Sequence, residues 1–412
     1  MARAPDAADE PAPRRRRREP ERSPLRELLR DPAGRTLAAV TGVLLLATIA
    51  ALIALWPTKD PVDPGGAFGG RTIAGTAQRV EVAPCGPLGQ DCRRVVAVVD
   101  EGPDRGDRVT LELGPVEATQ SVDAGQAIRL TRITGAPPGT PRYGFGDVDR
   151  RLPLVWLFIA FAAMGVVIAR RQGALALLGL IASLALVTTF LVPAMLEGTS
   201  PVLVSFVAAL AVMFVTLGLT YGVSAQSLSA AAGIGACLLF ATLLGQVALG
   251  ASHLDGRGGE LYPLLQQAGA GDLSLSGIVL AGMVIGALGV LTDTAVTQAS
   301  AVMALRRANT AMGVRDLYRG AFAVGRDHLA ARRHRPVRAY GGTLLPLLLV
   351  LEAADVGVTD ALNGQFLAEP AVATLVGSMA LMASVPLTTL LAALLAVRVP
   401  VAALPDAHAH AH

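Results

Sequence analysis

Apolar segments of similar length recur along this chain, one near its N-terminus and the others after residue 150. They cover Leu37–Trp56, Leu152–Ala169, Ala174–Leu196, Val202–Tyr221, Leu228–Leu249, Leu273–Leu291, Thr343–Ala354 and Ala371–Val397. Several of them reach the ~20 residues that a helix needs to cross a hydrocarbon layer of ~30 Å. The pattern therefore predicts an α-helical polytopic membrane protein with about eight transmembrane helices, the first at residues 36–56 and seven in a bundle at residues 152–400.

Residues 57–151 have a different pattern. Short runs rich in Val, Ile, Leu and Thr, such as "RRVVAVVD" and "DRVTLELG", are separated by Gly, Pro and Asp. This predicts a small β-domain of five or so strands, either an OB-like barrel or a sandwich. The segment has no His and no Ser in a nucleophile context, so we expect no catalytic site there.

Composition supports the membrane assignment. The chain of 412 residues is 52% hydrophobic and 16% charged, whereas soluble domains carry roughly 25% charged residues. Its basic residues are nearly all arginine, with Lys59 the only lysine, which is typical of a GC-rich bacterial genome. We therefore expect a multipass protein of the bacterial cytoplasmic membrane, with the lipid bilayer as its first partner.

Arginines indicate which loops face the cytoplasm, because cytoplasmic loops carry an excess of Lys and Arg. Outside the β-domain, which as a folded domain is largely exempt from this rule, they fall in the tail at residues 1–35, at Arg170 and Arg171, in a basic loop at residues 303–340, and at Arg398, with Arg257 the single exception in an opposing loop. The intervening loops "EGTS" and "VGVTDALNGQFLAEP" carry none. This predicts cytoplasmic N- and C-termini and an extracytoplasmic β-domain. We interpret the tail at residues 1–35 as disordered and as an anchor to anionic lipid, in preference to a nucleic-acid-binding arm.

The cysteines and the C-terminal histidines are the candidates for covalent or metal chemistry. Cys85 and Cys92 are separated by a short Gly- and Pro-containing turn, and in an oxidising compartment they could form a disulfide. Two thiolates alone do not fill a zinc site. The cytoplasmic tail at residues 401–412 places His408, His410 and His412 at alternating positions, which makes them weak metal candidates without a preformed geometry. We expect no resident metal and no cofactor.

A stripe of small and polar residues follows the apolar segment that begins at Leu273. Its members recur at steps of three and four, which places them on one helix face: Gly282, Gly286, Gly289, Asp293, Thr297 and Ser300. The glycines would let a neighbouring helix pack closely, within the chain or in a homo-oligomer. A carboxylate is costly in lipid, so Asp293 is expected to face protein or a water-filled cavity. The alternative is that Asp293 lies at the headgroup level and caps a break in the helix.

The polar residues around this stripe define a candidate transport path. We take Asp293, Thr294, Thr297, Gln298 and Ser300 as its lining, because hydroxyl, amide and carboxylate groups can replace water around a solute. Glu352 and Asp355, three residues apart, share a helix face near the expected outer mouth. The alternative for this pair is a helix that simply ends at the interface. His328, in a basic stretch, is interpreted as a surface residue.

Four motifs resemble the YibE/F family of bacterial membrane proteins. They are "GALGVLTDTAVTQASAV", "GRDHL", "AYGGTLLPLLL" and "LVGSMALMASVPLTTLLAALLA", in this order. The resemblance covers most of residues 150–397 and implies one N-terminal helix, an extracytoplasmic β-segment and a polytopic bundle. The family is described as permeases or proteins of unknown role. Thr292 departs from the Asp or Asn expected there, and "AARRHRPVRAY" is more basic than its counterpart.

Two functions remain open from the sequence. One is a permease-like protein that moves a small ion or polar solute along the polar path. The other is a non-transporting scaffold whose external β-domain binds an envelope or membrane protein partner. We expect no enzyme, since the chain has no "GxxxxGK[ST]", no HExxH and no GxSxG motif. We also expect no nucleic-acid binding, since the basic tail at residues 1–35 is interpreted as a lipid anchor.

Overall fold

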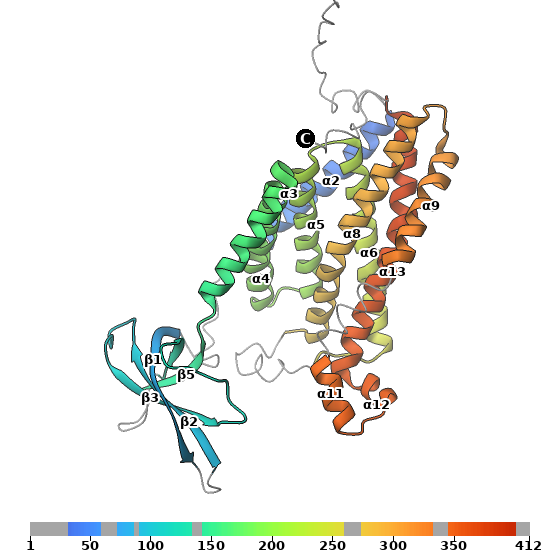
Figure 1. Cartoon of the computed structure of the whole chain (residues 1–412). Helices are drawn as coiled ribbons and strands as arrows, with labels where there is room; N and C mark the ends of the chain where they lie inside the picture. The colour runs from blue at the N-terminus through green and yellow to red at the C-terminus, as the bar shows by residue number, and fades with distance from the viewer. Residues whose placement is uncertain are drawn as a thin grey trace, which may run out of the picture.

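The computed structural model describes residues 32–58, 72–85, 90–133, 142–258, 273–332 and 345–400. A bundle of long helices makes up most of the protein, and a small sheet lies at one end of the bundle (Figure 1). The helices are α2 (Pro32–Ala54), α3 (Arg151–Leu186), α4 (Val192–Leu196), α5 (Pro201–Tyr221), α6 (Ala225–Ala251), α8 (Leu275–Ala308), α9 (Val314–Arg332), α11 (Leu345–Ala353), α12 (Val358–Asn363) and α13 (Gln365–Arg398). A π-helical turn, η1 (Val187–Leu191), joins α3 to α4.

In the part of the chain that the structure describes, six helices are long and apolar enough to cross a membrane. They are Gly34–Ala54, Arg151–Leu196, Pro201–Tyr221, Ala225–Ala251, Leu275–Ala308 and Gln365–Arg398. Such a set of apolar helices makes the chain a membrane protein, as predicted. The number predicted from the sequence was about eight, and two details account for the difference.

The first detail is that the helix Arg151–Leu196 folds back on itself. Arg170 has φ 48° and ψ −126°, which no α-helix allows. A Cβ on Gly173 would overlap the carbonyl oxygen of Gly165, although eight residues of straight helix would separate the two positions by about 12 Å. The chain therefore forms a hairpin of two helical arms, and its turn lies between the predicted segments Leu152–Ala169 and Ala174–Leu196.

The second detail concerns the predicted span Thr343–Ala354. Its described part, α11, has nine residues and no buried side chain, and nine residues extend only about 14 Å along a helix. The prediction that this segment crosses the membrane is not supported. Two residues after α11 ends, Asp355 has a left-handed φ of 54°. The N–H of the next residue, Val356, donates to the carbonyl of Leu351 at 3.0 Å. This is a Schellman ending.

The basic segment predicted as a loop at residues 303–340 is largely helical. Helix α8 continues to Ala308, and after a short turn α9 runs back along α8 and α13 (Figure 1). Leu317, Ala321 and Gly325 are spaced by four residues and buried, so they form the face that packs on the bundle. Three of the arginines that indicated a loop, Arg315, Arg319 and Arg326, lie on the exposed face of α9, whereas residues 333–340 lie outside the described part.

Arg306 joins the ends of three helices. Its Nε donates to the carbonyl of Ala396 at 3.2 Å, and its Nη1 donates to the carbonyl of Met312 at 3.0 Å and to that of Thr310. Its Nη2 donates to the carbonyl of Val397 at 3.4 Å. One planar guanidinium thus holds the C-terminal end of α8, the turn before α9 and the end of α13 together.

We expect Arg306→Lys to loosen this end of the bundle, because an ammonium cannot donate to four carbonyls in these directions. Loss of at least one of the charged hydrogen bonds should cost roughly 2 kcal/mol. Thermal unfolding of the purified protein in detergent measures the change. Arg315→Lys, on the exposed face of α9, serves as the control and should leave the midpoint unchanged; an equal drop in both variants would contradict the assignment.

The β-domain is a single antiparallel sheet with strand order β3-β2-β1-β4-β5. Its strands are β1 (Thr72–Cys85), β2 (Gln90–Val99), β3 (Arg108–Pro115), β4 (Ala127–Arg132) and β5 (Tyr143–Val148). The edge strands β3 and β5 also contact each other, so the sheet curls into a half-barrel around Ala77, Val95, Ala97, Ile128 and Leu130. The predicted five strands are present, and the sheet is closer to the barrel alternative than to a sandwich.

Arg129 connects this sheet to the helix that follows it. Its side chain donates to the carbonyl of Thr72, and its Nη1 lies 3.8 Å from carboxylate oxygens of both Glu101 and Asp149. Asp149 in turn accepts from the backbone N–H of Arg151 at 3.0 Å, in the first turn of α3. One nearly buried arginine therefore fixes the start of β1 and the start of the first helical arm.

Candidate functional site

The predicted glycine stripe on α8 faces outward. A Cβ on Gly282, Gly286 or Gly289 would meet nothing within 4 Å in the described structure, and Asp293 is exposed. The expectation that Asp293 turns inward among the neighbouring spans is therefore corrected. Residue spacing identified the stripe, but the buried face of α8 is the one that carries Leu280, Val284, Leu288 and Leu291.

Two other members of the predicted path are buried on that inward face. Gln298 is 1% exposed, and its Oε1 accepts a hydrogen bond from the Thr389 hydroxyl of α13 at 3.0 Å. The Thr294 hydroxyl, one turn earlier, donates to the carbonyl of Val290 at 3.0 Å. Thr297 and Ser300 are half-buried at the edge of this region. The five path candidates on α8 thus divide between the interior and the outer surface of the bundle.

Helix α9 approaches Gln298 most closely at Gly325. A Cβ on Gly325 would lie 2.6 Å from both the Gln298 amide nitrogen and a methyl group of Val385. Only glycine allows α8, α9 and α13 to meet at this distance. His328, three residues later, lines a cavity of about 10 Å³ with Thr294, Thr297 and Gln298, which is scarcely the space of one water molecule. His328 is exposed as predicted, but it also borders the buried polar groups.

Helix α6 completes this region from the other side. The Gln226 amide donates to the carbonyl of Val296 at 3.5 Å. Thr388 packs against Gly233, and its buried hydroxyl has no hydrogen-bond partner among the described residues. We call the buried polar groups here the polar junction: Gln226, Thr294, Gln298, Ser384, Thr388 and Thr389. Four of them, Gln226, Ser384, Thr388 and Thr389, were not predicted from the sequence. The signal that could have found two of them is the spacing of Ser384 and Thr388 by four residues, which places them on one helix face.

An apolar layer separates the polar junction from the β-domain end of the bundle. Along α8 its buried side chains are Leu280, Met283, Val284, Ala287, Leu288 and Leu291, and α6 adds Ile234, Leu238 and Ala241. From Leu280 to Thr294 the helix rises about 21 Å. At the far side of this layer, where α6 ends and α8 begins, there is a cavity of about 480 Å³.

The remaining predicted site residues lie away from the polar junction. Glu352 and Asp355 are exposed around the end of α11, at the β-domain end of the molecule (Figure 1). Asp293 interacts electrostatically with Tyr221, at the end of the bundle opposite to the β-domain. The three carboxylates therefore do not share one region of the bundle.

The candidates for covalent and metal chemistry have separate positions. Cys85 and Cys92 are joined as a disulfide where β1 and β2 meet, with their Cα atoms 5.6 Å apart. His408, His410 and His412 lie outside the described residues. Within the described ranges no group of three or more His, Cys, Asp or Glu side chains could hold a metal ion.

Comparison with known proteins identifies the helical part. Residues 157–398 match the family described as YibE/F-like protein. This range contains the polar junction, the apolar layer and the glycine stripe. No curated protein and no solved structure matches the chain.

Proposed function

Since this chain belongs to the YibE/F-like family, we propose that it is a permease-like membrane protein that carries a small ion or polar solute through the helical bundle. The polar junction is the observation that carries the proposal. Buried amide and hydroxyl groups inside a membrane bundle are costly unless paired, and such groups can replace the water around a passing solute. Gln298 and Thr389 are the residues that we expect to contact it.

The proposed path enters at the polar junction and is closed toward the β-domain end by the apolar layer. Hydrophobic constrictions of this kind block permeation by excluding water. The cluster of arginines at the junction end supports an orientation in a bacterial cytoplasmic membrane with both termini inside: Arg35, Arg170, Arg171, Arg306 and Arg398. In this orientation the β-domain is extracytoplasmic.

A double variant separates transport from a merely structural role. Gln298→Leu with Thr389→Val removes both partners of the 3.0 Å hydrogen bond, and replacing both partners by apolar groups of similar shape can be nearly neutral for stability. In vesicles with the purified protein we expect flux of one solute from a panel of sodium, potassium, ammonium and a sugar alcohol. The double variant should lower that flux by at least about tenfold while its unfolding temperature stays within a few degrees. Unchanged flux in the double variant would refute the proposal.

One observation favours the scaffold as a second candidate. The β1–β2 hairpin extends from the sheet away from the bundle (Figure 1), is closed by the disulfide and exposes Val82 by 58%. A single exposed valine is ordinary on a protein surface, so it is the projecting, cross-linked hairpin that would form the contact, with Val82 as its apolar residue. If the protein is a scaffold, Val82→Asp should abolish co-purification of an envelope protein, whereas the Gln298→Leu/Thr389→Val variant should retain it.

A further inference from the structure

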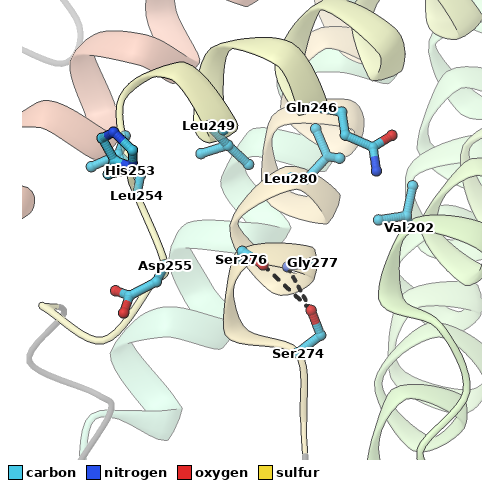
Figure 2. Close-up of a pocket in the computed structure, with 11 residues that line it drawn as sticks. Val202, Gln246, Leu249, His253, Leu254, Asp255, Ser274, Ser276, Gly277 and Leu280 are labelled. Carbon is cyan, nitrogen blue, oxygen red and sulfur yellow. Dashed lines mark hydrogen bonds between the residues drawn. The ribbon is translucent and has the colours of Figure 1, made fainter.

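The cavity at the β-domain end of the bundle has the size and lining of a small-molecule site. Its volume of about 480 Å³ lies within the usual range of ligand pockets. Figure 2 shows that the turn after α6, with His253, Leu254 and Asp255, lies on one side, and that the first turns of α8 lie beside it. Val202 of α5 and Gln246 of α6 complete the wall.

The backbone of this turn is held in a strained conformation that shapes the cavity. Helix α6 ends in a Schellman motif, in which the N–H of Leu254 donates to the carbonyl of Leu249 at 3.1 Å. His253 occupies its left-handed position with φ 51°, where glycine is usual. The turn directs Leu254 into the floor of the cavity, where it is 7% exposed beside Leu249 and Leu280. Strain of this kind clusters at binding sites.

The charge of the lining selects the class of ligand. Asp255 is the one acidic side chain of the lining, and no Arg or Lys belongs to the lining in the described structure. Arg257, outside the lining, places its Nε 3.7 Å from an Asp255 carboxylate oxygen, and both side chains of this pair are more than half exposed, so the pair is weak. The Gln365 amide donates to Asp255 at 2.9 Å, and the backbone N–H of Arg257 donates to it at 3.0 Å. These hydrogen bonds hold the pKa of the Asp255 carboxyl below its usual range, so the group is ionised. Ser274, Ser276 and Gln246 add neutral polar groups, and the leucines supply an apolar floor.

We propose that this cavity binds a small organic cation, with its ammonium group at Asp255 and its alkyl part on Leu249, Leu254 and Leu280. An anion would meet the carboxylate, whose basic partner in the described structure, Arg257, lies outside the lining. A bare metal ion would have two side-chain ligands of the usual types, His253 and Asp255, and would gain nothing from the leucine floor. The proposal goes beyond the proposed permease function and does not depend on it, since binding is measured without flux.

The test uses the full-length protein in detergent and n-butylammonium as the probe, with n-butyrate and n-butanol as analogues of equal chain length. Isothermal titration calorimetry should show saturable binding of n-butylammonium alone. Gly250 lines the cavity, and a Cβ there would meet nothing within 4 Å, so Gly250→Leu should fill the cavity without disturbing the helix and should abolish binding. Gly282→Leu, the same substitution at an open helical glycine that lies outside the lining, on the exposed face of α8, should bind normally.

A second pair of variants tests the charge. Asp255→Asn should weaken n-butylammonium binding about fivefold, as expected for a partly exposed ion pair. Glu352→Gln removes the same charge at the same end of the molecule, outside the cavity, and should leave binding unchanged. The proposal is overturned if n-butyrate or n-butanol binds as well as n-butylammonium, if zinc ion binds in place of it, or if Gly250→Leu binds like the unmodified protein.

Discussion

Gly325→Leu is expected to displace α9 from the bundle. The new Cβ would lie 2.6 Å from the Gln298 amide and from a methyl group of Val385. The Gln298 amide can turn away only by giving up its hydrogen bond to Thr389, and the short branched side chain of Val385 can move little, so α9 itself must shift. Overpacking a buried position costs 1–3 kcal/mol, occasionally more, and here we expect about 3 kcal/mol. Hydrogen exchange of the purified protein should show amides of residues 314–329 exchanging at least about tenfold faster.

A matched control separates the clash from the chemistry of leucine itself. Gly377→Leu makes the same change inside α13, where a Cβ would meet nothing within 4 Å. Leucine is a better helix former than glycine, so this variant should be no less stable than the unmodified protein. If α9 remains protected in Gly325→Leu, the close approach of the three helices at Gln298 is not the contact that holds α9.

Arg129→Gln is expected to produce the other large effect. Arg129 is 9% exposed. Its guanidinium donates to the carbonyl of Thr72 and lies between the carboxylates of Glu101 and Asp149. Removing the guanidinium leaves the partly buried carboxylate of Asp149 without its partner, whereas Glu101, whose side chain is 59% exposed, keeps its contact with water. With the hydrogen bonds to Thr72 also lost, we expect a cost of about 3 kcal/mol. Amides of β1, β4 and the first turn of α3 should then exchange together, because Arg129 and Asp149 connect all three.

The control for Arg129 is another arginine of the same sheet. Arg79 pairs with Glu81 at 3.4 Å, and its side chain is 74% exposed, so Arg79→Gln should change exchange in the sheet very little. Faster exchange in β1 and β4 without any change in α3 would mean that Arg129 stabilises the sheet alone and does not connect it to the helix.

The sequence predicted where the helices and strands lie along the chain better than it predicted which side of each helix packs against the rest of the protein. Apolar runs of sufficient length and alternating β-branched runs identified most of the spanning helices and the sheet, because both depend on local pattern. The inward face of α8 could not be predicted in the same way. In a membrane both faces of a helix are apolar or small, so the glycine stripe resembled a packing surface and Leu280, Val284 and Leu288 resembled lipid contacts.

The polar junction shows why a site is harder to predict than a helix. Thr294 and Gln298 were identified because they lie beside Asp293 in the sequence, whereas Thr389 and Gln226 lie more than 60 residues away and come together only when the helices pack. Gly325 was not recognised at all, since its role depends on the 2.6 Å approach to two other helices. The predicted span at Thr343–Ala354 is not confirmed, since its described part, α11, has nine residues, and an apolar run does not by itself reveal how much of it forms one helix.

The hairpin at Arg170 gives the lipid a direct influence on the β-domain. Both buried residues of α3, Gly173 and Gly179, lie in the second arm, so the first arm, Arg151–Ala169, rests against acyl chains on nearly every side. A helix in that situation adjusts its tilt to the thickness of the hydrocarbon around it. Since the sheet is joined to the base of this arm through Asp149, we expect the angle between the sheet and the helical bundle to change when the bilayer becomes thinner or thicker.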